Sequence, residues 1–435
     1  MDASKRDAGL VRAVGPWGLA ASSICIIVGA GIFAVPAELA ASVGTYAPLA
    51  LLVCALAIGA VAICFAEGGS RLASSGGAYG YIAAAFGPLT GFVAGTLSWF
   101  GSILACGGVG SALAVVIAEL LPPAYRAPAR TLVIVGVIGG IALVNVGGVV
   151  HATRLVNAAT VLKLLPLLIF VVVGAAAMHG GNFTQSVQPG MAGLGRGLIL
   201  AMFAFSGMEI SLGASGEVAN PARTIPRALA LAMVAVTVLY IAIQVVAQGM
   251  LGPALAHSRL PLADAMGRIS PLLRLLMLAG AAVSMFGLLS SELLGNPRIL
   301  FAFARDGFLP AALGRVHPRS HAPHVAILVN AGIAIGLALT GTFAELAVLS
   351  ILATMPLYIL GCAAAWRLAR GGVVQGGEPL NFRWLGTAAV VGIASMLLLI
   401  SLAAREEIIG LLVVLTGSVC CYLLLTRVVR RRVPG

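Results

Sequence analysis

Charged residues are scarce in this sequence. Only 9% of its 435 residues are Asp, Glu, Lys or Arg, whereas 60% are hydrophobic. A soluble globular protein carries about 25% charged residues, so that class is excluded, and no segment is polar enough for a separate soluble domain. The mean hydropathy of +1.07 indicates a polytopic, all-α membrane protein.

The sequence also lacks the patterns of enzymes and metal centres. There is no phosphate-binding loop with its lysine, no HExxH and no nucleophile elbow with partners. The seven cysteines lie within apolar stretches and predict buried structural thiols. His317, His321 and His324 share one loop without a carboxylate cluster. We therefore expect no catalytic residue, no metal site and no cofactor.

Acidic residues are fewer than basic ones, 14 against 26, which gives a net charge of +12. In a soluble chain this excess would suggest nucleic acid. Here the basic residues fall in short loops between apolar stretches, so we expect the lipid bilayer to be the partner and expect no nucleic acid.

Apolar stretches long enough to cross a bilayer recur along the chain. They lie at about 14–41, 46–70, 88–120, 129–150, 155–178, 195–216, 226–250, 271–297, 324–341, 345–369, 384–403 and 407–427. Twelve spans place both termini on one side. If residues 1–13 and 428–435 are cytoplasmic, the inner segments hold more than twice as many basic residues as the outer ones. The positive-inside rule therefore places both termini inside. The short basic N-terminus followed at once by a full-length span predicts a signal anchor that is not cleaved.

A helix break is expected in the first span, at Val28-Gly29-Ala30-Gly31-Ile32-Phe33. Unpaired backbone at membrane depth requires protein or a wet cavity around it. The amides of Gly29, Ala30 and Gly31 would carry the positive end of a half-helix, a site suited to a carboxylate. The alternative is that these glycines only allow close helix packing.

A second break is expected in the sixth span, at Phe203-Ala204-Phe205-Ser206-Gly207-Met208-Glu209. Interrupted spans in matching halves of a chain point to the binding site of a secondary transporter. The first ten spans divide into two sets of five, 14–178 and 195–369. Because five is odd, the second set would be an inverted copy, and 384–427 would be an added pair.

Several motifs together resemble the amino acid–polyamine–organocation transporters. They include Gly29-Ala30-Gly31-Ile32-Phe33, Ser75-Gly76-Gly77-Ala78-Tyr79-Gly80-Tyr81, Phe205-Ser206-Gly207-Met208-Glu209, Glu217-Val218-Ala219-Asn220-Pro221 and Asn296-Pro297-Arg298. The resemblance runs from about Leu10 to the tenth span. It implies the LeuT-like five-plus-five inverted repeat, usually with twelve transmembrane helices.

The resemblance also implies how a substrate would bind. The carboxylate of an amino acid would meet the amides of Gly29, Ala30 and Gly31. Its ammonium would meet carbonyls at the ends of the half-helices, which match Ile27, Phe203 and Ser206, with Gly207 and Glu209 beside them. The side chain of Phe203 would be an aromatic lid. The group of Arg223, Arg227 and Glu217 would form cytoplasmic ion pairs that help to close the inner side.

Lys163 lies inside the fifth span. A lysine at that depth must be paired or neutral unless its head reaches the interface. It matches a lysine of sodium-independent family members, where a resident cation takes the place of a sodium ion. This resemblance implies transport without sodium, by exchange or by proton coupling.

Two intramembrane carboxylates are further candidates. Glu209 would accept a proton or organise the second break. Glu292, in the eighth span, would contact a cationic side chain if it faces the substrate, and would otherwise be a paired structural group. One face of the third span carries small residues at i, i+4 and i+8, namely Ser98, Ser102 and Cys106. They would either line a pocket or serve helix packing.

The sequence thus predicts an inner-membrane permease or antiporter that moves amino acids by alternating access, with cationic amino acids as candidate substrates. Carriers of neutral amino acids or polyamines are alternatives of the same fold. A channel or a non-transporting sensor would be a different class. Exchange versus symport, and monomer versus homodimer, stay open.

Overall fold

The computed structural model describes residues 16–72, 77–147, 163–183, 190–207, 221–305, 307–374 and 379–432. All regular elements in these ranges are helices. The main ones are α1 (Pro16–Ile27), α2 (Gly31–Val43), α3 (Ala47–Arg71), α4 (Gly77–Phe86), α5 (Pro88–Ala118), α6 (Arg126–Gly147), α8 (Leu164–Ala175), α9 (Met191–Ala204), α11 (Pro221–Leu251), α12 (Pro261–Gly267), α13 (Pro271–Gly295), α14 (Pro297–Arg305), α15 (His324–Thr340), α16 (Phe343–Arg370), α17 (Leu385–Ser401) and α18 (Arg405–Arg432).

The lengths of these helices suit a membrane. Seven helical segments in the described ranges are long and apolar enough to cross one, and four more are apolar but shorter, at Leu164–Ala175, Gly193–Ala204, His324–Thr340 and Leu385–Ser401. Each apolar stretch expected from the sequence coincides with one or two of the helices wherever the chain is described.

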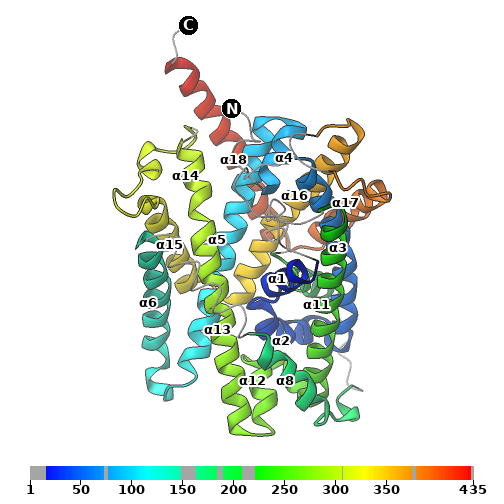
Figure 1. The fold of residues 1–435 in the computed structure, drawn as a ribbon. Helices are drawn as coiled ribbons and strands as arrows, with labels where there is room; N and C mark the ends of the chain where they lie inside the picture. Colours follow the sequence, from blue (N-terminus) through cyan, green and yellow to red (C-terminus); the bar gives the residue numbers. More distant parts are fainter. Residues whose placement is uncertain are drawn as a thin grey trace.

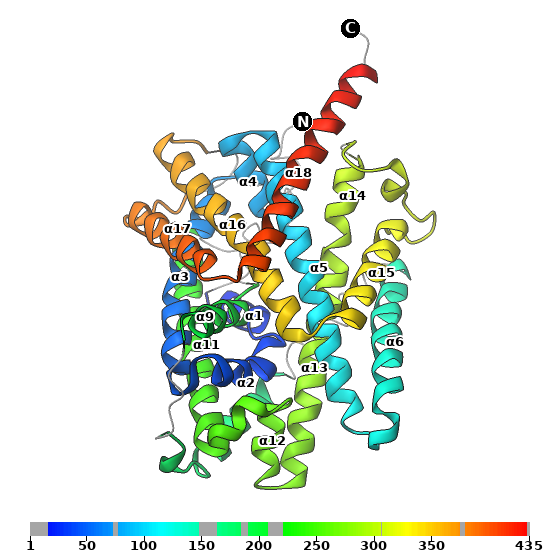
Figure 2. The same ribbon diagram turned by 180° about the vertical axis from the view of Figure 1, so that it is seen from behind.

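Short helices occupy the middle of the bundle. Figures 1 and 2 show α1, α2 and α9 there, among the longer α3, α5, α11 and α16, and contacts join α1 to α11 and α9 to both α2 and α3. Helix α4 and the C-terminal end of α18 lie at one end of the bundle, called here the α4 end, and α12 lies at the opposite, α12 end (Figure 1).

Small residues let the long helices approach closely. On α5, a Cβ at Gly101 would lie 2.6 Å from the Thr354 hydroxyl oxygen, and one at Gly107 would lie 2.6 Å from Cβ of Leu337. Close approach of this kind is how membrane helices gain packing energy without a hydrophobic drive between them. It fixes α5 against α15 and α16 and so gives the centre a rigid wall.

Polar residues inside the bundle are hydrogen-bonded to one another. The indole of Trp99 on α5 donates to the Asn330 carbonyl oxygen on α15 at 3.1 Å, and the amide of Asn296, which follows α13, donates to the same oxygen at 3.2 Å. Asn330 is fully buried. One side-chain oxygen therefore ties three helices together.

Candidate substrate site at two helix breaks

The first helix is broken where the sequence predicted. Helix α1 ends at Ile27 and α2 begins at Gly31, and residues 28–30 between them are not helical. The Val28 amide closes α1 by donating to the Ile24 carbonyl at 2.8 Å. Ile27, Val28 and Ala30 are at most 2% exposed, so the interrupted backbone lies in the protein interior, as such backbone must.

The unpaired amides of this break lie one residue further along the chain than expected. The Gly29 amide turns back and donates to the Ile27 carbonyl at 2.7 Å. The amides of Ala30, Gly31 and Ile32 donate to no carbonyl of the described residues. They stand at the N-terminal end of α2, where the helix dipole is positive, so this half of the break is suited to an anion.

The second break begins where α9 ends. After Ala204 the chain forms a tight turn, in which the Phe205 amide donates to Met202 at 3.1 Å and the Ser206 amide donates to Phe203 at 3.2 Å. Gly207 then takes a φ of 99°, which favours glycine. Glu209 and the remainder of the sixth span, with Glu217, lie outside the described residues, as does the side chain of Arg223.

The two breaks touch each other. A Cβ placed on Gly31 would lie 3.4 Å from the Cα of Ala204 and 3.5 Å from the ring of Phe203. Helices α2 and α9 are in contact over this region. The structure therefore brings together the two segments that the sequence singled out, although they are more than 170 residues apart.

A residue that the sequence analysis missed joins both breaks. Tyr240 on α11 is fully buried, and its hydroxyl donates to the Ile27 carbonyl at 3.0 Å beside the backbone of Gly29. Its ring lies 5.2 Å from that of Phe205. The available signal was a single phenol inside an apolar span, because a buried tyrosine hydroxyl needs a partner.

Two of the three carbonyls expected to hold an ammonium group, those of Ile27 and Phe203, already accept internal hydrogen bonds. Ile27 accepts from both the Gly29 amide and the Tyr240 hydroxyl. Phe203 accepts from the Ser206 amide and, at 2.7 Å, from the Ser206 hydroxyl. A carbonyl oxygen has two lone pairs, so an ammonium could bind here only after a hydroxyl turned away.

Phe203, the residue expected to be an aromatic lid, is buried at the end of α9 against the start of α16. It is 5% exposed, and its ring meets that of Phe343, at the start of α16, edge to face with centroids 5.6 Å apart. Because Phe203 also contacts the Gly31 backbone, this aromatic pair covers the break on the side toward α16.

Lys163 is buried, at 5% exposure, directly before the first residue of α8. Its side chain therefore packs inside the protein and does not extend into solvent. Pro166 on the same helix packs against Gly280 of α13, where an added Cβ would lie 3.9 Å from the ring of Phe33 on α2. The lysine thus sits at the end of a helix that packs close to the first span.

Glu292 lies on α13 one helical turn after Leu288, a residue that packs near the first break. Leu288 has a methyl carbon 3.7 Å from where a Gly29 Cβ would stand. Glu292 also interacts electrostatically with Cys106 of α5 and is half-buried. Ser98 and Ser102 on α5 are half-buried as well, so the carboxylate faces the small-residue surface of that helix.

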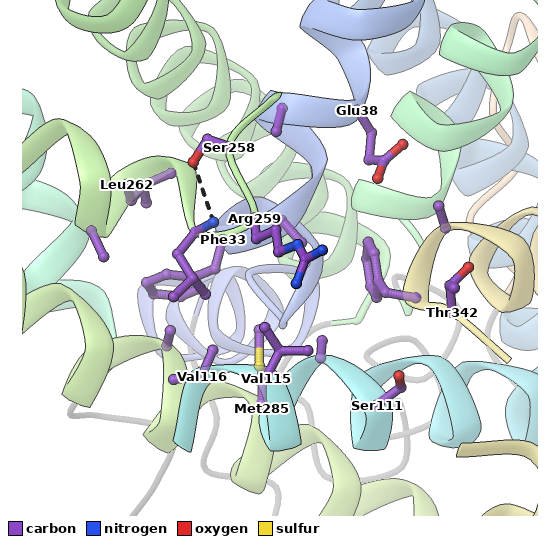
Figure 3. Close-up of a pocket in the computed structure, with 18 of the residues that line it drawn as sticks. Phe33, Glu38, Ser111, Val115, Val116, Ser258, Arg259, Leu262, Met285 and Thr342 are labelled. Atoms are coloured by element: carbon purple, nitrogen blue, oxygen red, sulfur yellow. Dashed lines mark hydrogen bonds between the residues drawn. The ribbon is translucent and has the colours of Figure 1, made fainter. Parts of the chain in front are cut away.

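A separate cavity of ≈ 540 Å³ opens at the α12 end. It is called the vestibule here. Its wall is formed by α2, α5, α12, α13, the start of α16 and the 3₁₀ turn Gly252–His257. Figure 3 shows Phe33 and Met285 along its apolar side and Glu38 and Thr342 on the opposite side, with Arg259 between them.

No group of histidine, cysteine and carboxylate side chains able to hold a metal ion occurs among the described residues. His317 instead has a structural role, because its Nδ1 accepts from the amides of Arg319 and Ser320. Its ring packs against His324 at 5.7 Å.

Comparison with known proteins agrees with this geometry. A profile of the amino acid permease family matches residues 14–404. The chain is 31% identical to an uncharacterized transporter of Mycobacterium tuberculosis (strain ATCC 25618 / H37Rv), over 88% of this chain and 86% of the relative. It is 26% identical to a branched-chain amino acid permease of Bacillus subtilis (strain 168), over 98% and 95%.

A third relative is a methylthioribose transporter of Bacillus subtilis (strain 168), 27% identical over 80% of this chain and 79% of that protein. The family profile covers both helix breaks and most of the bundle. The chain therefore belongs to the amino acid permease family of the amino acid–polyamine–organocation superfamily, and it is a multi-pass membrane transporter rather than an enzyme.

Proposed function

We propose that this protein is a sodium-independent secondary transporter that moves amino acids across the cytoplasmic membrane by alternating access. The observation that carries the proposal is the pair of touching helix breaks, with open amides on one of them, in a chain of the amino acid permease family. Such breaks at the centre of a helical bundle are where transporters of this architecture bind small charged molecules.

The proposal includes the LeuT-like inverted repeat, with 14–178 and 195–369 as its halves and 384–427 as an added pair. It also places both termini and the α4 end in the cytoplasm and the α12 end outside. The positions of the breaks in the first and sixth spans support the repeat. The excess of basic residues on the inner segments supports the orientation.

Within the site, the substrate carboxylate would bind the amides that open α2, at Ala30 and Gly31, with Gly29 turning to join them. Its ammonium would bind the Ile27, Phe203 and Ser206 carbonyls once the Tyr240 and Ser206 hydroxyls have moved. This exchange of internal hydrogen bonds for substrate bonds would link substrate occupancy to the shape of both breaks. Gly207 and Glu209 would shape the second break.

Lys163 would supply a fixed or titrating positive charge in place of a sodium ion. Its burial beside a helix that packs close to the first span supports this role. Glu209 would be the second group in coupling. Exchange and proton coupling both remain compatible with these residues.

Substrate charge is a finer question. Glu292, one helical turn after Leu288 on α13, favours a cationic amino acid such as lysine or arginine. The Bacillus relative named for branched-chain amino acids favours a neutral substrate. Comparing Glu292→Gln with wild type decides between them. If Glu292 binds a cationic side chain, the variant should transport lysine or arginine much more slowly while its alanine transport changes little. An equal change in the transport of both would show that Glu292 does not contact the substrate.

The decisive experiment uses purified protein in liposomes, screened for uptake of all common amino acids and polyamines under varied proton and sodium gradients. Saturable uptake of an amino acid, unchanged by sodium and lost in Lys163→Ala, supports the proposal. A rate that rises steeply with sodium contradicts the role of Lys163. Non-saturable flux would indicate a channel, and binding without flux would indicate a sensor.

A further inference from the structure

The vestibule carries more positive than negative side chains. Arg130, Arg196 and Arg259 line it, whereas Glu38 is the single carboxylate among its lining residues. All three arginines are exposed to the cavity or its opening. A concave surface with one predominant sign of charge concentrates ions of the opposite sign.

Pairing of the charged groups leaves two of these arginines without a counter-ion. Arg196 interacts electrostatically with Glu38 and with Glu345. Arg130 and Arg259 form no hydrogen bond or ion pair with any other residue in the described part of the chain. Their guanidinium groups therefore remain open to a ligand.

The other acids near this end are held elsewhere. Glu119 pairs with Arg126 at 3.1 Å and with Arg274 at 3.2 Å. Asp264 accepts from the Ser258 hydroxyl at 2.6 Å. These carboxylates are engaged with partners, so they do not neutralise the two open arginines at short range.

Arg259 is presented on a braced turn. The Ser258 hydroxyl accepts from the Leu260 amide at 3.2 Å while it donates to Asp264, and the Asp264 amide donates back to the Leu260 carbonyl at 2.8 Å. Figure 3 shows the Arg259 side chain extending from this turn into the cavity. The turn therefore holds the backbone of Arg259 in place, while the side chain remains free to meet a ligand.

An aromatic pair links the vestibule to the first break. Phe343 lines the vestibule, and its ring packs on Phe203 at 5.6 Å. Phe203 in turn contacts the Gly31 backbone, whose amide is open. The arginines of the vestibule and the amides at the start of α2 thus lie on surfaces that the Phe203–Phe343 pair joins.

We propose that Arg259 and Arg130 form a docking site for the carboxylate of the substrate, occupied before the aromatic pair opens. The inference rests on the proposed transport function. An apolar wall that includes Phe33, Leu262 and Met285 faces this site and accepts an uncharged side chain. The site admits acidic and zwitterionic amino acids and disfavours cationic ones, in opposition to the preference that Glu292 alone would give.

The test measures initial uptake rates in liposomes at low ionic strength for glutamate, leucine and lysine, in wild type and in Arg259→Gln. We expect the KM for glutamate to rise on the order of fivefold in the variant, that for leucine to rise less, and that for lysine to stay or fall. Raising the ionic strength to about 1 M shortens the Debye length to about 3 Å. The lower KM that wild type has for glutamate relative to Arg259→Gln should then disappear.

Three variants act as controls. Arg259→Lys keeps the charge and should retain most of the wild-type preference, which also shows that the turn folds. Glu38→Gln frees Arg196 and should lower the KM for glutamate. Arg126→Gln removes an arginine already paired with Glu119 at the same end and should leave the preference among the three substrates unchanged.

The two proposals fail in different ways. If wild-type liposomes take up no amino acid, the transport function itself is wrong. If they transport but Arg259→Gln changes all three substrates equally, or changes none at low ionic strength, the vestibule does not select by charge and the docking site is refuted. A wild type that prefers lysine over glutamate, with no change in Arg259→Gln, also refutes it.

Discussion

At the scale of single residues, the site depends on backbone groups rather than on reactive side chains. In the described part of the chain the amides at the start of α2 have no carbonyl partner, whereas the Ile27 and Phe203 carbonyls are occupied by internal donors. The resting site is therefore more complete for an anion than for a cation. Variants at Gly29 and Gly31 test the amide side of the site, and a variant at Tyr240 tests the carbonyl side.

Gly29→Leu and Gly31→Leu should each abolish uptake while the protein still inserts in the membrane. An added Cβ at Gly31 would lie 3.4–3.5 Å from Ala204 and Phe203, and one at Gly29 would lie 3.7 Å from Leu288. The larger leucine side chain would therefore have to displace these neighbours and distort the break. Gly59→Leu is the matched control, because nothing lies within 4 Å of its added Cβ. Normal uptake in both break variants would refute the site assignment.

Tyr240→Phe should separate stability from affinity. Loss of the hydroxyl removes one hydrogen bond to a carbonyl that keeps its other donor, which costs about 1 kcal/mol of stability. The freed lone pair of Ile27 is then available to the ammonium, so KM should fall by up to roughly fivefold. Thermal unfolding in detergent and uptake kinetics measure the two effects. An unchanged KM would argue that Ile27 does not bind the ammonium.

At the scale of helices, buried polar pairs decide which elements stay together. Glu67 and Arg71 on α3 form an ion pair at 2.7 Å, with side chains 0% and 5% exposed. Arg71 also donates to the Asn381 side chain at 2.8 Å, and the Phe382 amide donates to Glu67 at 3.2 Å. Asn381 takes a φ of 52°, which asparagine tolerates. This cluster fixes the segment before α17 to the end of α3.

Glu67→Gln should be strongly destabilising, by about 3–5 kcal/mol, because it leaves the Arg71 guanidinium buried without its counter-ion. The double variant Glu67→Leu with Arg71→Met should lose less than the single one, since it removes both charges. Thermal unfolding in detergent measures both.

Glu119→Gln is the matched control for this prediction. Its ion pairs with Arg126 and Arg274 are partly exposed, so its loss should cost less than about 1 kcal/mol. If both glutamate variants unfold at the same temperature, burial does not make the Glu67–Arg71 ion pair contribute more to stability than the partly exposed pairs of Glu119.

At the scale of the whole molecule, the bundle separates two chemically different ends. The α12 end holds the vestibule with its open arginines. The loop between α14 and α15 lies at the α4 end (Figure 2), and both Arg315 and Arg319 in it are exposed. The proposed orientation places the first end outside and the second in the cytoplasm.

Thiol labelling checks this orientation in whole cells. In a background with Cys420 and Cys421 replaced by serine, a membrane-impermeant reagent should label His257→Cys in intact cells, because His257 is exposed at the α12 end. It should label Arg319→Cys only after the cells are permeabilised. The reverse pattern would invert the orientation, and the vestibule would then face the cytoplasm.

The sequence by itself determined the helices and the first break. Apolar stretches of bilayer length can only be helices or barrel strands, and paired glycines with a following proline interrupt a helix locally, so positions such as Gly29 and Gly31 could be identified without coordinates. Both determinants act over a few neighbouring residues, which is why pattern and family motifs sufficed.

Only the tertiary structure decided which groups the breaks meet. Tyr240 reaches Ile27 across 213 residues and Arg71 reaches Asn381 across 310. Arg130 on α6 and Arg259 in the turn before α12 line one cavity. Such partners depend on how the helices pack against each other. The residue pattern of one helix does not specify which residues of another helix it contacts. The occupied carbonyls and the open arginines were therefore visible only once the chain had folded.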